Sequence, residues 1–408
     1  MKVLISAYAC EPHKGSEPGV GWNWAKQIAK FADAWVITRA NNKEVIEKEL
    51  KKNPDANLHF TYVDLPKWMT FWKIKQRGVR TYYYLWQLAL LKEAKRLNSS
   101  VHFDLLHHVT FVNDWLPSAL ALIGVPFVWG PIGSHPPFPG NFHPNNKSFI
   151  LEKARVLTQK IFRFIDPFFY ATLFNAKQII PINRQIQKKY PFTLVSTHKF
   201  NPQLAIAVDA LQEITNLKKE QKNCSVISVG RLIYIKGFHL ALKAFSEANK
   251  KIPDMILKII GDGTERKNLE QISLNDNLTD RIFFLGNISR ENVINEMNKS
   301  DIFLFPSFEG GGMVVLEAMA AGLPVVCLDY GGPGEMVTDE CGIKVKPISP
   351  DQTIKDLSDA LLKLANDTEL RKRMGEAGRR RVEEFYTWDK KGEFIRKLYE
   401  EVLDEHHL

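Results

Sequence analysis

The stretch from Asp301 to Val337 constrains the fold more than any other part of the chain. It predicts a strand over 301–306, a glycine-rich turn over 309–312, a helix over 313–321 and a second apolar strand over 324–328. A glycine directly after the helix and a proline shortly beyond it are typical of a helix C-terminus. Strand, turn, helix and strand in this order indicate an α/β protein built on a parallel sheet.

The turn in this stretch is suited to bind phosphate. Three glycines at 310–312 precede the helix, so backbone N–H groups are left free at its positive end. Glu309 and Glu317 flank the turn, and a carboxylate beside phosphate-binding amides is unfavourable unless it binds something else. Sugar or ribose hydroxyls fit that role, so we interpret the segment as a nucleotide-sugar site. The alternative is an ordinary strand-to-helix joint in which Glu317 only complements the helix dipole.

Length and composition set the class of protein. At 408 residues the chain is too long for one ordinary core, and two domains of about 200 residues are expected. The 45% hydrophobic and 25% charged content is typical of a globular protein. A formal net charge of +9 favours anionic partners, which are phosphates, acidic lipid surfaces or nucleic acid.

The cysteines and the N-terminus favour a cytoplasmic protein. The four cysteines form no CxxC pair, and three lie in or beside apolar strands, which predicts reduced, buried thiols and neither zinc nor disulfides. The apolar N-terminal run leads into a glycine loop rather than a cleavage site. No apolar stretch reaches the length of about 18 residues that a transmembrane helix requires.

The first half of the chain also alternates strands and helices. A buried strand over 2–9 is followed by the glycine loop 11–23 and a helix over 20–31. Further strands are predicted at 34–38, 59–63, 105–109 and 127–129. This alternation predicts a doubly wound parallel sheet.

Two segments, 67–96 and 147–170, combine cations with aromatic residues. Cations beside interfacial aromatics are what a surface on anionic lipid requires. The alternative is a pair of core helices with solvated basic faces. The aromatic residues of these segments include Trp68, Phe71, Tyr82, Tyr83, Trp86, Phe162, Phe164, Phe168 and Phe169.

The second half resembles a known enzyme family. After a polar run at 192–221, interpreted as an interdomain linker, the strings GRLIYIKG, IGDG, FLGNIS and FEGGGMVVLEAMAAGLPVV follow one another between residues 224 and 345. Their order and spacing resemble the C-terminal domain of family-4 retaining glycosyltransferases. The resemblance implies a GT-B architecture, with two Rossmann-like domains that face each other across a cleft. Residues 1–205 with a C-terminal helix at about 386–408 would form the acceptor-side domain, and residues 206–385 the donor-binding domain.

The resemblance also implies roles for individual residues. Arg231 and Lys236 would hold the donor diphosphate and supply the charge that a metal otherwise provides, so metal-independent chemistry without a cofactor is expected. Glu309 would bind hydroxyls of the donor sugar, and Glu317 those of the ribose. Asn287 and Ile288 would lie along the base, and the N–H groups of Gly311, Gly312, Met313 and Val314 would bind sugar and phosphate oxygens. Gly19 would approach the phosphates from the opposite domain, and Gly230 precedes Arg231 in the donor site.

The chain departs from the family at the histidine that many relatives place after an N-terminal-domain strand. Gly130 and Pro131 stand at that position here. His107 and His108 end the preceding strand, where ligands bind in such sheets, and adjacent strand residues point to opposite faces. Both are therefore favoured over His135, which lies in the glycine-proline loop after the next strand. At most one of the pair should enter the cleft, and we expect His108 to be catalytic; a structural histidine is the alternative.

The expected function is retaining transfer of a hexose from a nucleoside-diphosphate sugar to an acceptor hydroxyl. The acceptor would be a lipid-linked, polysaccharide or lipopolysaccharide precursor, and the basic aromatic segments would rest on the cytoplasmic face of a membrane. A nucleotide-sugar epimerase or phosphorylase on the same fold is one alternative, and a non-catalytic membrane or nucleic-acid binder is another. No nucleic-acid-binding motif supports a nucleic-acid binder, and no complete GxGxxG motif supports a dehydrogenase.

Overall fold

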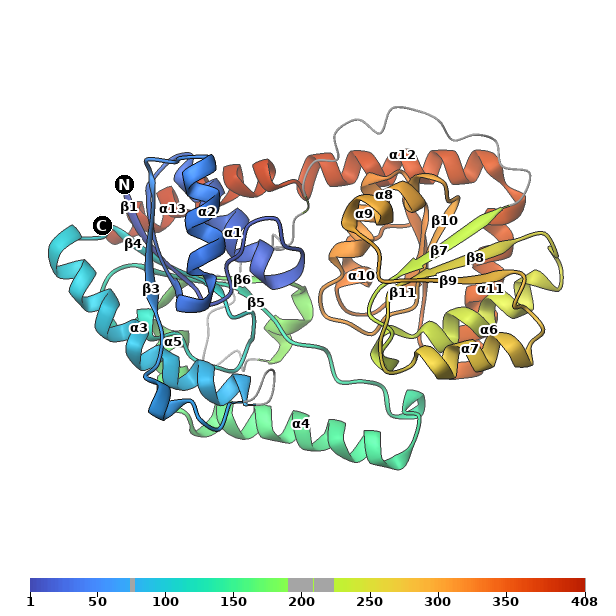
Figure 1. The fold of residues 1–408 in the computed structure, drawn as a ribbon, viewed down its shortest axis with the longest axis horizontal. Coiled ribbons are helices and arrows are strands. Elements are labelled where there is room, and N and C mark those ends of the chain that lie inside the picture. The colour runs from blue at the N-terminus through green and yellow to red at the C-terminus, as the bar shows by residue number, and fades with distance from the viewer. Residues whose placement is uncertain (74–77, 190–207, 209–223, 408) are drawn as a thin grey trace. The chain divides into compact units, whose positions relative to one another are not determined.

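The computed structural model describes residues 1–73, 78–189, 208 and 224–407. These residues form two compact units, each built on its own β-sheet (Figure 1). Apart from residue 208, the linker expected at 192–221 lies outside the described residues.

Each unit contains chain from both halves of the sequence. The first unit comprises the described residues of Met1–Ser134, Lys153–Ile206 and Trp388–Leu408, and the second those of His135–Glu152 and Ala207–Thr387. The assignment of all residues 1–205 to the first domain therefore differs from the structure at 135–152. This segment joins the second unit because Phe142, which is 2% exposed, is part of its hydrophobic core.

The first sheet contains six parallel strands in the order β3-β2-β1-β4-β5-β6. Helix α1 (Ser16–Ala29) packs with α13 (Trp388–His407), and the rings of Trp24 and Trp388 lie 6.0 Å apart. Helices α3 (Val79–Val101) and α5 (Pro167–Asn175) pack on the strand-to-strand segment near residue 120. Helix α2 (Lys43–Lys52) and the part of α4 (Asn146–Ile165) from Lys153 onwards complete this unit. The strands are β1 (Lys2–Ala7), β2 (Asp33–Arg39), β3 (Leu58–Val63), β4 (Leu105–Thr110), β5 (Phe127–Ile132) and β6 (Ala176–Pro181).

The second sheet repeats this design, with six parallel strands in the order β12-β11-β10-β7-β8-β9. Numbered from its own first strand, it has the same 3-2-1-4-5-6 order as the first sheet, which is the Rossmann order. The prediction of two doubly wound parallel-sheet domains is confirmed. The strands are β7 (Ser225–Val229), β8 (Ile256–Ile260), β9 (Ile282–Gly286), β10 (Ile302–Phe305), β11 (Val325–Leu328) and β12 (Gly342–Val345).

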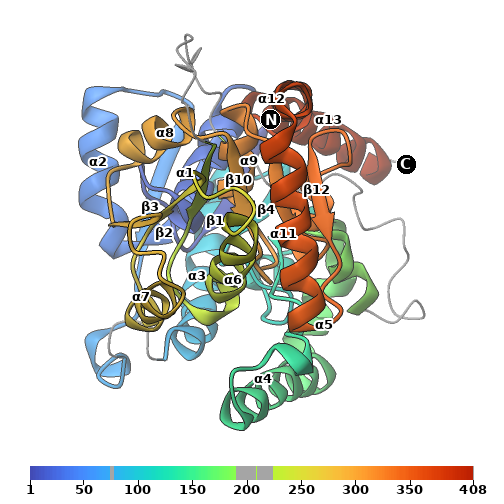
Figure 2. The same ribbon diagram turned by 90° about the vertical axis from the view of Figure 1, so that its right-hand side faces the viewer.

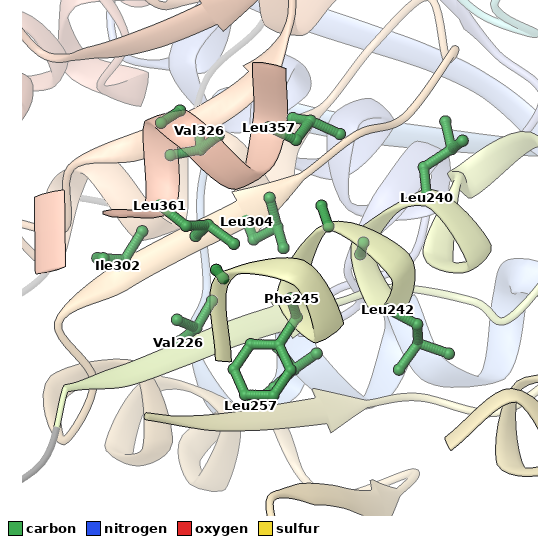
Figure 3. Close-up of a cluster of buried hydrophobic side chains, with 14 of the residues drawn as sticks. Val226, Leu240, Leu242, Phe245, Leu257, Ile302, Leu304, Val326, Leu357 and Leu361 are labelled. Atoms are coloured by element: carbon green, nitrogen blue, oxygen red, sulfur yellow. The ribbon is translucent and has the colours of Figure 1, made fainter. Parts of the chain in front are cut away.

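Helices cover both faces of the second sheet. On one face α6 and α11 lie side by side with α7 next to α6 (Figure 2), while α9 packs against α12. Leucines of α6 and α11 meet buried residues of the strands in one apolar cluster, which Figure 3 shows around Phe245. The helices of this unit are α6 (Phe238–Asn249), α7 (Arg266–Asn275), α8 (Arg290–Asn298), α9 (Met313–Ala320), α10 (Gly331–Met336), α11 (Pro350–Asn366) and α12 (Thr368–Phe385).

Helix α1 begins earlier than the glycine pattern predicts. It starts at Ser16 rather than Val20, with Pro18 in the first turn, where proline costs no hydrogen bond. Gly19 is therefore a buried helical residue rather than part of an open loop. A Cβ atom on Gly19 would lie 2.0 Å from the carbonyl oxygen of Lys14, so the glycine permits close packing of the preceding loop on the helix.

The two basic aromatic segments differ in exposure. In 67–96, Tyr82, Tyr83 and Trp86 are buried in the core of the first unit, so the expectation of a lipid-facing aromatic surface is wrong for this part of the segment. Their three- and four-residue spacing is that of one buried helix face. Trp68 and Phe71, by contrast, are 74% and 83% exposed. Lys75 and Arg77 lie outside the described residues.

The segment 147–170 is largely exposed. Seven apolar residues of α4 are between 39% and 78% exposed, whereas Phe169 of α5 is buried. Among the described residues, no helix combines the length and the apolar character needed to cross a membrane. The exposed apolar residues of α4 are Ile150, Leu151, Leu157, Ile161, Phe162, Phe164 and Ile165.

Candidate active site

The candidate site of the second unit lies at the carboxyl ends of β7 and β10. These strands are neighbours at the point where the strand order reverses, which is where ligands bind in open α/β sheets. Gly230 and Arg231 follow β7, and Phe308 and Glu309 follow β10 after a short turn. Two of the motifs found in the sequence therefore meet at one edge of the sheet.

Backbone contacts hold these two turns together. The N–H of Phe308 donates to the carbonyl oxygen of Ile235 at 3.0 Å. Gly237 has a φ of +67°, and a Cβ there would lie 1.9 Å from the carbonyl oxygen of Pro306. Only glycine allows this approach without strain. The turn that carries Lys236 is thereby fixed against the loop that carries Glu309.

Lys236 and Glu309 form an ion pair at the centre of the site. The Lys236 Nζ donates to Glu309 Oε2, and the two side chains are 15% and 14% exposed. The same Nζ lies 5.2 Å from the centroid of the Phe305 ring. Glu309 Oε1 is buried and accepts no hydrogen bond from any described residue. A buried carboxylate oxygen without a donor is costly, so this atom is ready to accept a hydrogen bond from a ligand hydroxyl.

Arg231 provides a second cation at the end of β7. Its side chain is exposed and makes no hydrogen bond or ion pair with the described residues. The preceding residue is held in place, since the Gly230 N–H donates to the Ile260 carbonyl at 2.9 Å. A fixed backbone with a free guanidinium suits Arg231 to bind an oxyanion.

The turn after Glu309 leads into α9 without a side-chain cap. Gly312 occupies the N-cap position with a φ of +126°. The N–H groups at the start of a helix point along its axis and favour an anion. The four residues expected to offer these N–H groups lie here: Gly312 is the N-cap, Gly311 precedes it, and Met313 and Val314 are the first two residues of α9.

Glu317 is paired with an arginine that the sequence reasoning did not identify. Its side chain is 19% exposed, and Arg290 Nη2 lies 3.4 Å from Glu317 Oε1. Arg290 opens α8, directly after the strand end that carries Asn287 and Ile288. Asn287 is exposed and Ile288 is half-buried. No spacing rule relates Arg290 to Glu317 in the sequence, and only the fold brings these residues of α8 and α9 together.

A segment from the first half of the sequence supports the loops that carry Lys236 and Glu309. We call residues 135–152 the arm. The Phe138 and Phe142 rings lie 4.6 Å and 5.0 Å from that of Phe308, which precedes Glu309. The Tyr234 hydroxyl donates to the Phe142 carbonyl at 2.8 Å. The arm therefore packs against the residues next to both Lys236 and Glu309, a role that no local pattern in the sequence indicated.

The remaining candidates, Gly19 and His108, lie in the first unit. His108 is fully buried in the sheet, with its ring 6.4 Å from Tyr83 and its Nε2 3.2 Å from the Phe111 carbonyl oxygen. Burial lowers the pKa of His108 to about 4, against a smaller opposing effect of that hydrogen bond. The side chain is therefore neutral near pH 7 and offers no exposed atom to a substrate in this structure.

His107 has a structural environment. Its Nε2 lies 2.6 Å from the Gly130 carbonyl oxygen, and its Nδ1 lies 2.6 Å from the Tyr399 hydroxyl of α13. Burial lowers its pKa to about 3. Both nitrogens are satisfied by the protein, so His107 joins β4 to β5 and to the C-terminal helix.

Residues 210–381 match the family model described as glycosyl transferases group 1. This part of the chain is similar to known glycosyltransferases. An uncharacterized glycosyltransferase of Methanocaldococcus jannaschii is 35% identical over 178 residues, which are 43% of this chain and 48% of that protein. The GDP-mannose-dependent monoacylated alpha-(1-6)-phosphatidylinositol monomannoside mannosyltransferase of Corynebacterium glutamicum is 32% identical over 176 residues, which are 41% and 45% of the two chains. The chain spans about half the length of the curated relatives it matches.

Solved structures resemble the whole chain at low identity. Sucrose-phosphate synthase of Thermosynechococcus elongatus superimposes with a TM-score of 0.67 at 18% identity, and the match covers 99% of this chain and 100% of that one. Anabaena Alr3699/HepE in complex with UDP gives a TM-score of 0.65 at 17% identity, covering 98% and 100%. WaaG, a glycosyltransferase involved in lipopolysaccharide biosynthesis, gives 0.61 at 18% identity, covering 96% and 99%. At these identities the likeness shows the shared two-domain α/β fold.

Proposed function

We propose that this protein is a retaining glycosyltransferase that moves a hexose from a nucleoside-diphosphate sugar to an acceptor hydroxyl. The observation that carries the proposal is the cluster at the ends of β7 and β10. There, Glu309 offers an unpartnered buried oxygen beside the cation Lys236, and Arg231 adds a free cation. The match of residues 210–381 to glycosyl transferases group 1 supports this function, as does the likeness in fold to a protein solved with UDP.

In this proposal each residue has a defined task. Arg231 and Lys236 neutralise the charge that develops on the departing diphosphate, so that no metal ion is needed. Glu309 Oε1 accepts a hydrogen bond from a hydroxyl of the donor sugar, and Glu317 one from the ribose. The N–H groups of residues 311–314 bind sugar and phosphate oxygens, Gly230 holds the turn of Arg231, and Asn287 and Ile288 lie along the base.

The proposed reaction keeps the configuration of the sugar. The acceptor oxygen bonds to the anomeric carbon on the face from which the diphosphate leaves, while the bond between that carbon and the phosphate oxygen breaks. The acceptor proton passes to the departing phosphate oxygen, so the products are a glycoside and a nucleoside diphosphate. No carboxylate is required as a nucleophile.

A binding screen followed by kinetics tests this proposal. UDP, GDP and ADP and their sugar conjugates are screened by thermal shift, since a ligand that binds only the folded protein raises its stability. With the donor so identified, Arg231→Ala and Lys236→Ala are each expected to lower kcat about 100-fold, because each removes one preorganised charge. Lys243→Ala, an exposed lysine of α6, is the matched control. Transfer at the wild-type rate by both site variants would refute the assignment, and loss of activity in EDTA would refute metal independence.

Product analysis without an acceptor separates the alternatives. A glycosyltransferase gives slow hydrolysis to free sugar and nucleoside diphosphate, whereas an epimerase gives an isomeric nucleotide sugar. A phosphorylase requires inorganic phosphate and releases a sugar phosphate. Detection of either of these products in place of hydrolysis would overturn the proposed function.

We further propose that the acceptor is lipid-linked and that α4 rests on an anionic membrane surface. The exposed apolar residues of α4 occur together with Lys147, Lys153, Arg155 and Lys160. An amphipathic helix of this kind gains free energy both from burial of its apolar side chains among lipids and from attraction to anionic head groups. Trp68 and Phe71 add two exposed aromatic rings.

Sedimentation with vesicles tests the membrane part. The wild-type protein is expected to bind vesicles of phosphatidylglycerol and phosphatidylcholine more strongly than vesicles of phosphatidylcholine alone. Replacing Phe164 and Ile165 with serine should release it. Phe385→Ser is the control, because Phe385 is a 52% exposed apolar residue on α12. Equal binding by the α4 variant and the control would contradict a role for α4.

A further inference from the structure

The first sheet has its own ligand-binding position. Its strand order reverses between β1 and β4, so the loops after these two strands flank the point where an open α/β sheet binds ligands. Glu17 is located there. It lies in the first turn of α1, and its Oε1 accepts a hydrogen bond from the N–H of Val112, just beyond β4.

Glu17 adjoins a group of aromatic side chains from three elements. Tyr8 follows β1, Tyr83 belongs to α3 and Phe111 follows β4. The Phe111 ring lies 5.5 Å from that of Tyr8 and 4.8 Å from that of Tyr83. Tyr8 and Tyr83 are buried, whereas Phe111 is half-buried. A carboxylate beside a partly exposed aromatic ring is a combination that suits a sugar, because the ring contacts C–H groups and the carboxylate accepts from hydroxyls.

The charges around Glu17 leave its carboxylate uncompensated. Burial raises its pKa to about 7, and the hydrogen bond from Val112 opposes this shift. Tyr8 and Tyr83 face it, and burial raises the pKa of both, so they stay neutral. Arg39 donates a hydrogen bond to the Tyr8 hydroxyl at 3.1 Å, and the charge of Asp64 raises the pKa of Tyr8. The ring of the neutral His108 lies 6.4 Å from that of Tyr83.

One oxygen of Glu17 remains available. Oε1 is used by Val112, whereas Oε2 has no hydrogen-bond partner among the described residues. A glutamine would accept the Val112 hydrogen bond equally well and would avoid the cost of a half-buried charge. The backbone contact alone therefore does not explain why the residue is a carboxylic acid.

We infer that Glu17 binds a hydroxyl group of the acceptor sugar through its free carboxylate oxygen, with the sugar ring against Phe111. The inference rests on the proposed function, since it assigns the acceptor side of the same reaction. It moves the acceptor-side candidate of the first unit from the buried His108 to the strand-end carboxylate.

The test compares Glu17→Gln with wild type and with the control Glu44→Gln. Glu44 is an exposed acid in the first turn of α2. The acceptor probes are octyl glycosides of glucose, galactose and mannose, used with the donor found in the screen. KM for the acceptor, kcat, nucleoside-diphosphate affinity and Tm are measured at pH 6, 7 and 8.

For wild type, the acceptor KM should fall about tenfold from pH 6 to pH 8, as the carboxylate fraction rises from about one tenth to about nine tenths around a pKa near 7. Glu17→Gln should raise the acceptor KM at least tenfold at pH 8 and remove its pH dependence. Its nucleotide affinity and hydrolysis of donor in water should stay at wild-type values. Its Tm should not fall, because the Val112 hydrogen bond is kept, and should rise at pH 8, where the wild-type protein holds a half-buried charge.

An unchanged acceptor KM in Glu17→Gln would overturn the inference, as would a rise in KM that retains the wild-type pH profile. A lower Tm with an unchanged acceptor KM would show that Glu17 only fixes the backbone, which also overturns it. Failure of the proposed function is distinct, because the wild-type protein itself would then neither bind a nucleoside diphosphate nor hydrolyse a nucleotide sugar.

Discussion

Replacing Phe142 with alanine should destabilise the second unit, although residue 142 belongs to the first half of the sequence. Phe142 is 2% exposed and lies in the same apolar core as Phe308. Phenylalanine-to-alanine changes in cores cost about 3–5 kcal/mol, from lost burial and the cavity that remains. The arm is a connecting segment that can partly close such a cavity, so we expect a loss of about 3 kcal/mol.

The distribution of tryptophan makes this prediction measurable for each unit. All nine tryptophans fall within the residue ranges of the first unit. Their fluorescence therefore follows unfolding of that unit, while far-UV circular dichroism follows helices of both. With an m-value of about 3 kcal/mol/M in urea, Phe142→Ala should lower the midpoint of the second unit by about 1 M in the circular dichroism curve. The fluorescence transition should move less.

The matched control is Phe164→Ala, which removes the same side chain from a position that is 78% exposed. It should change neither transition by more than about 0.5 kcal/mol. A circular dichroism curve that is unchanged in Phe142→Ala would refute the packing of the arm on the second unit. A loss seen only in tryptophan fluorescence would assign the arm to the first unit instead.

Two further predictions concern the pH dependence of stability and a glycine. The pKa of His108 is about 4 in the folded protein and about 6.5 when unfolded, so the unfolded chain gains the proton first and stability falls as pH decreases from 6.5 towards 4. The contribution of Glu17 to stability has the opposite sign: as pH decreases from 7 to about 4.3, the folded state takes up the Glu17 proton first, so stability rises. His108→Phe should therefore reduce the slope between pH 6 and 5 by about 1.4 kcal/mol per pH unit in urea titrations followed by fluorescence, and an unchanged slope contradicts this. Gly237 has a φ of +67°, and a Cβ there would lie 1.9 Å from the Pro306 carbonyl oxygen, so Gly237→Ala should lower the free energy of unfolding by more than about 2 kcal/mol and reduce turnover. A Cβ at Gly15 would have no atom within 4 Å, so Gly15→Ala should be neutral. Equal effects of the two variants would contradict the steric argument.

The sequence was sufficient to predict two parallel sheets, because most of their strands are short apolar runs followed by glycine turns. The edge strands β6 and β12 were not predicted. Parallel strands covered on both faces carry this signal without any need for an alternating pattern. The same coverage explains why the sequence did not reveal that His107 and His108 are both buried. A strand end predicts a ligand site, but opposite faces of β4 are both packed, so both side chains are buried. Which face is open depends on helices far away in the sequence.

Aromatic and glycine patterns were ambiguous for a similar reason. Tyr82, Tyr83 and Trp86 have the composition of a lipid-facing surface and the spacing of a buried helix face, and packing on the first sheet decides between them. Gly19 fits an open loop and a tightly packed helix equally well. In each case local physics allows two answers, and a distant contact selects one.

The motifs at the ends of β7 and β10 were predictable as separate turns, but their coupling was not. The Lys236–Glu309 pair joins residues 73 positions apart, and neither turn alone indicates that one oxygen of Glu309 is left unpaired. The Arg290–Glu317 pair is of the same kind. The first pair follows from the strand order, since the parallel neighbours β7 and β10 bring their carboxyl ends to one edge.

The exchange of segments between the halves of the chain limits how far the second unit can be treated as a separate domain. A chain restricted to residues 206–385 would retain Arg231, Lys236 and Glu309 but would lack the arm, so Phe308 would lose the rings of Phe138 and Phe142. The hydrogen bond from Tyr234 to the arm would be lost as well. Because these contacts lie close to Lys236 and Glu309, the loops that carry them depend on a segment far earlier in the sequence; Tyr234 and Phe142, for example, are 92 residues apart.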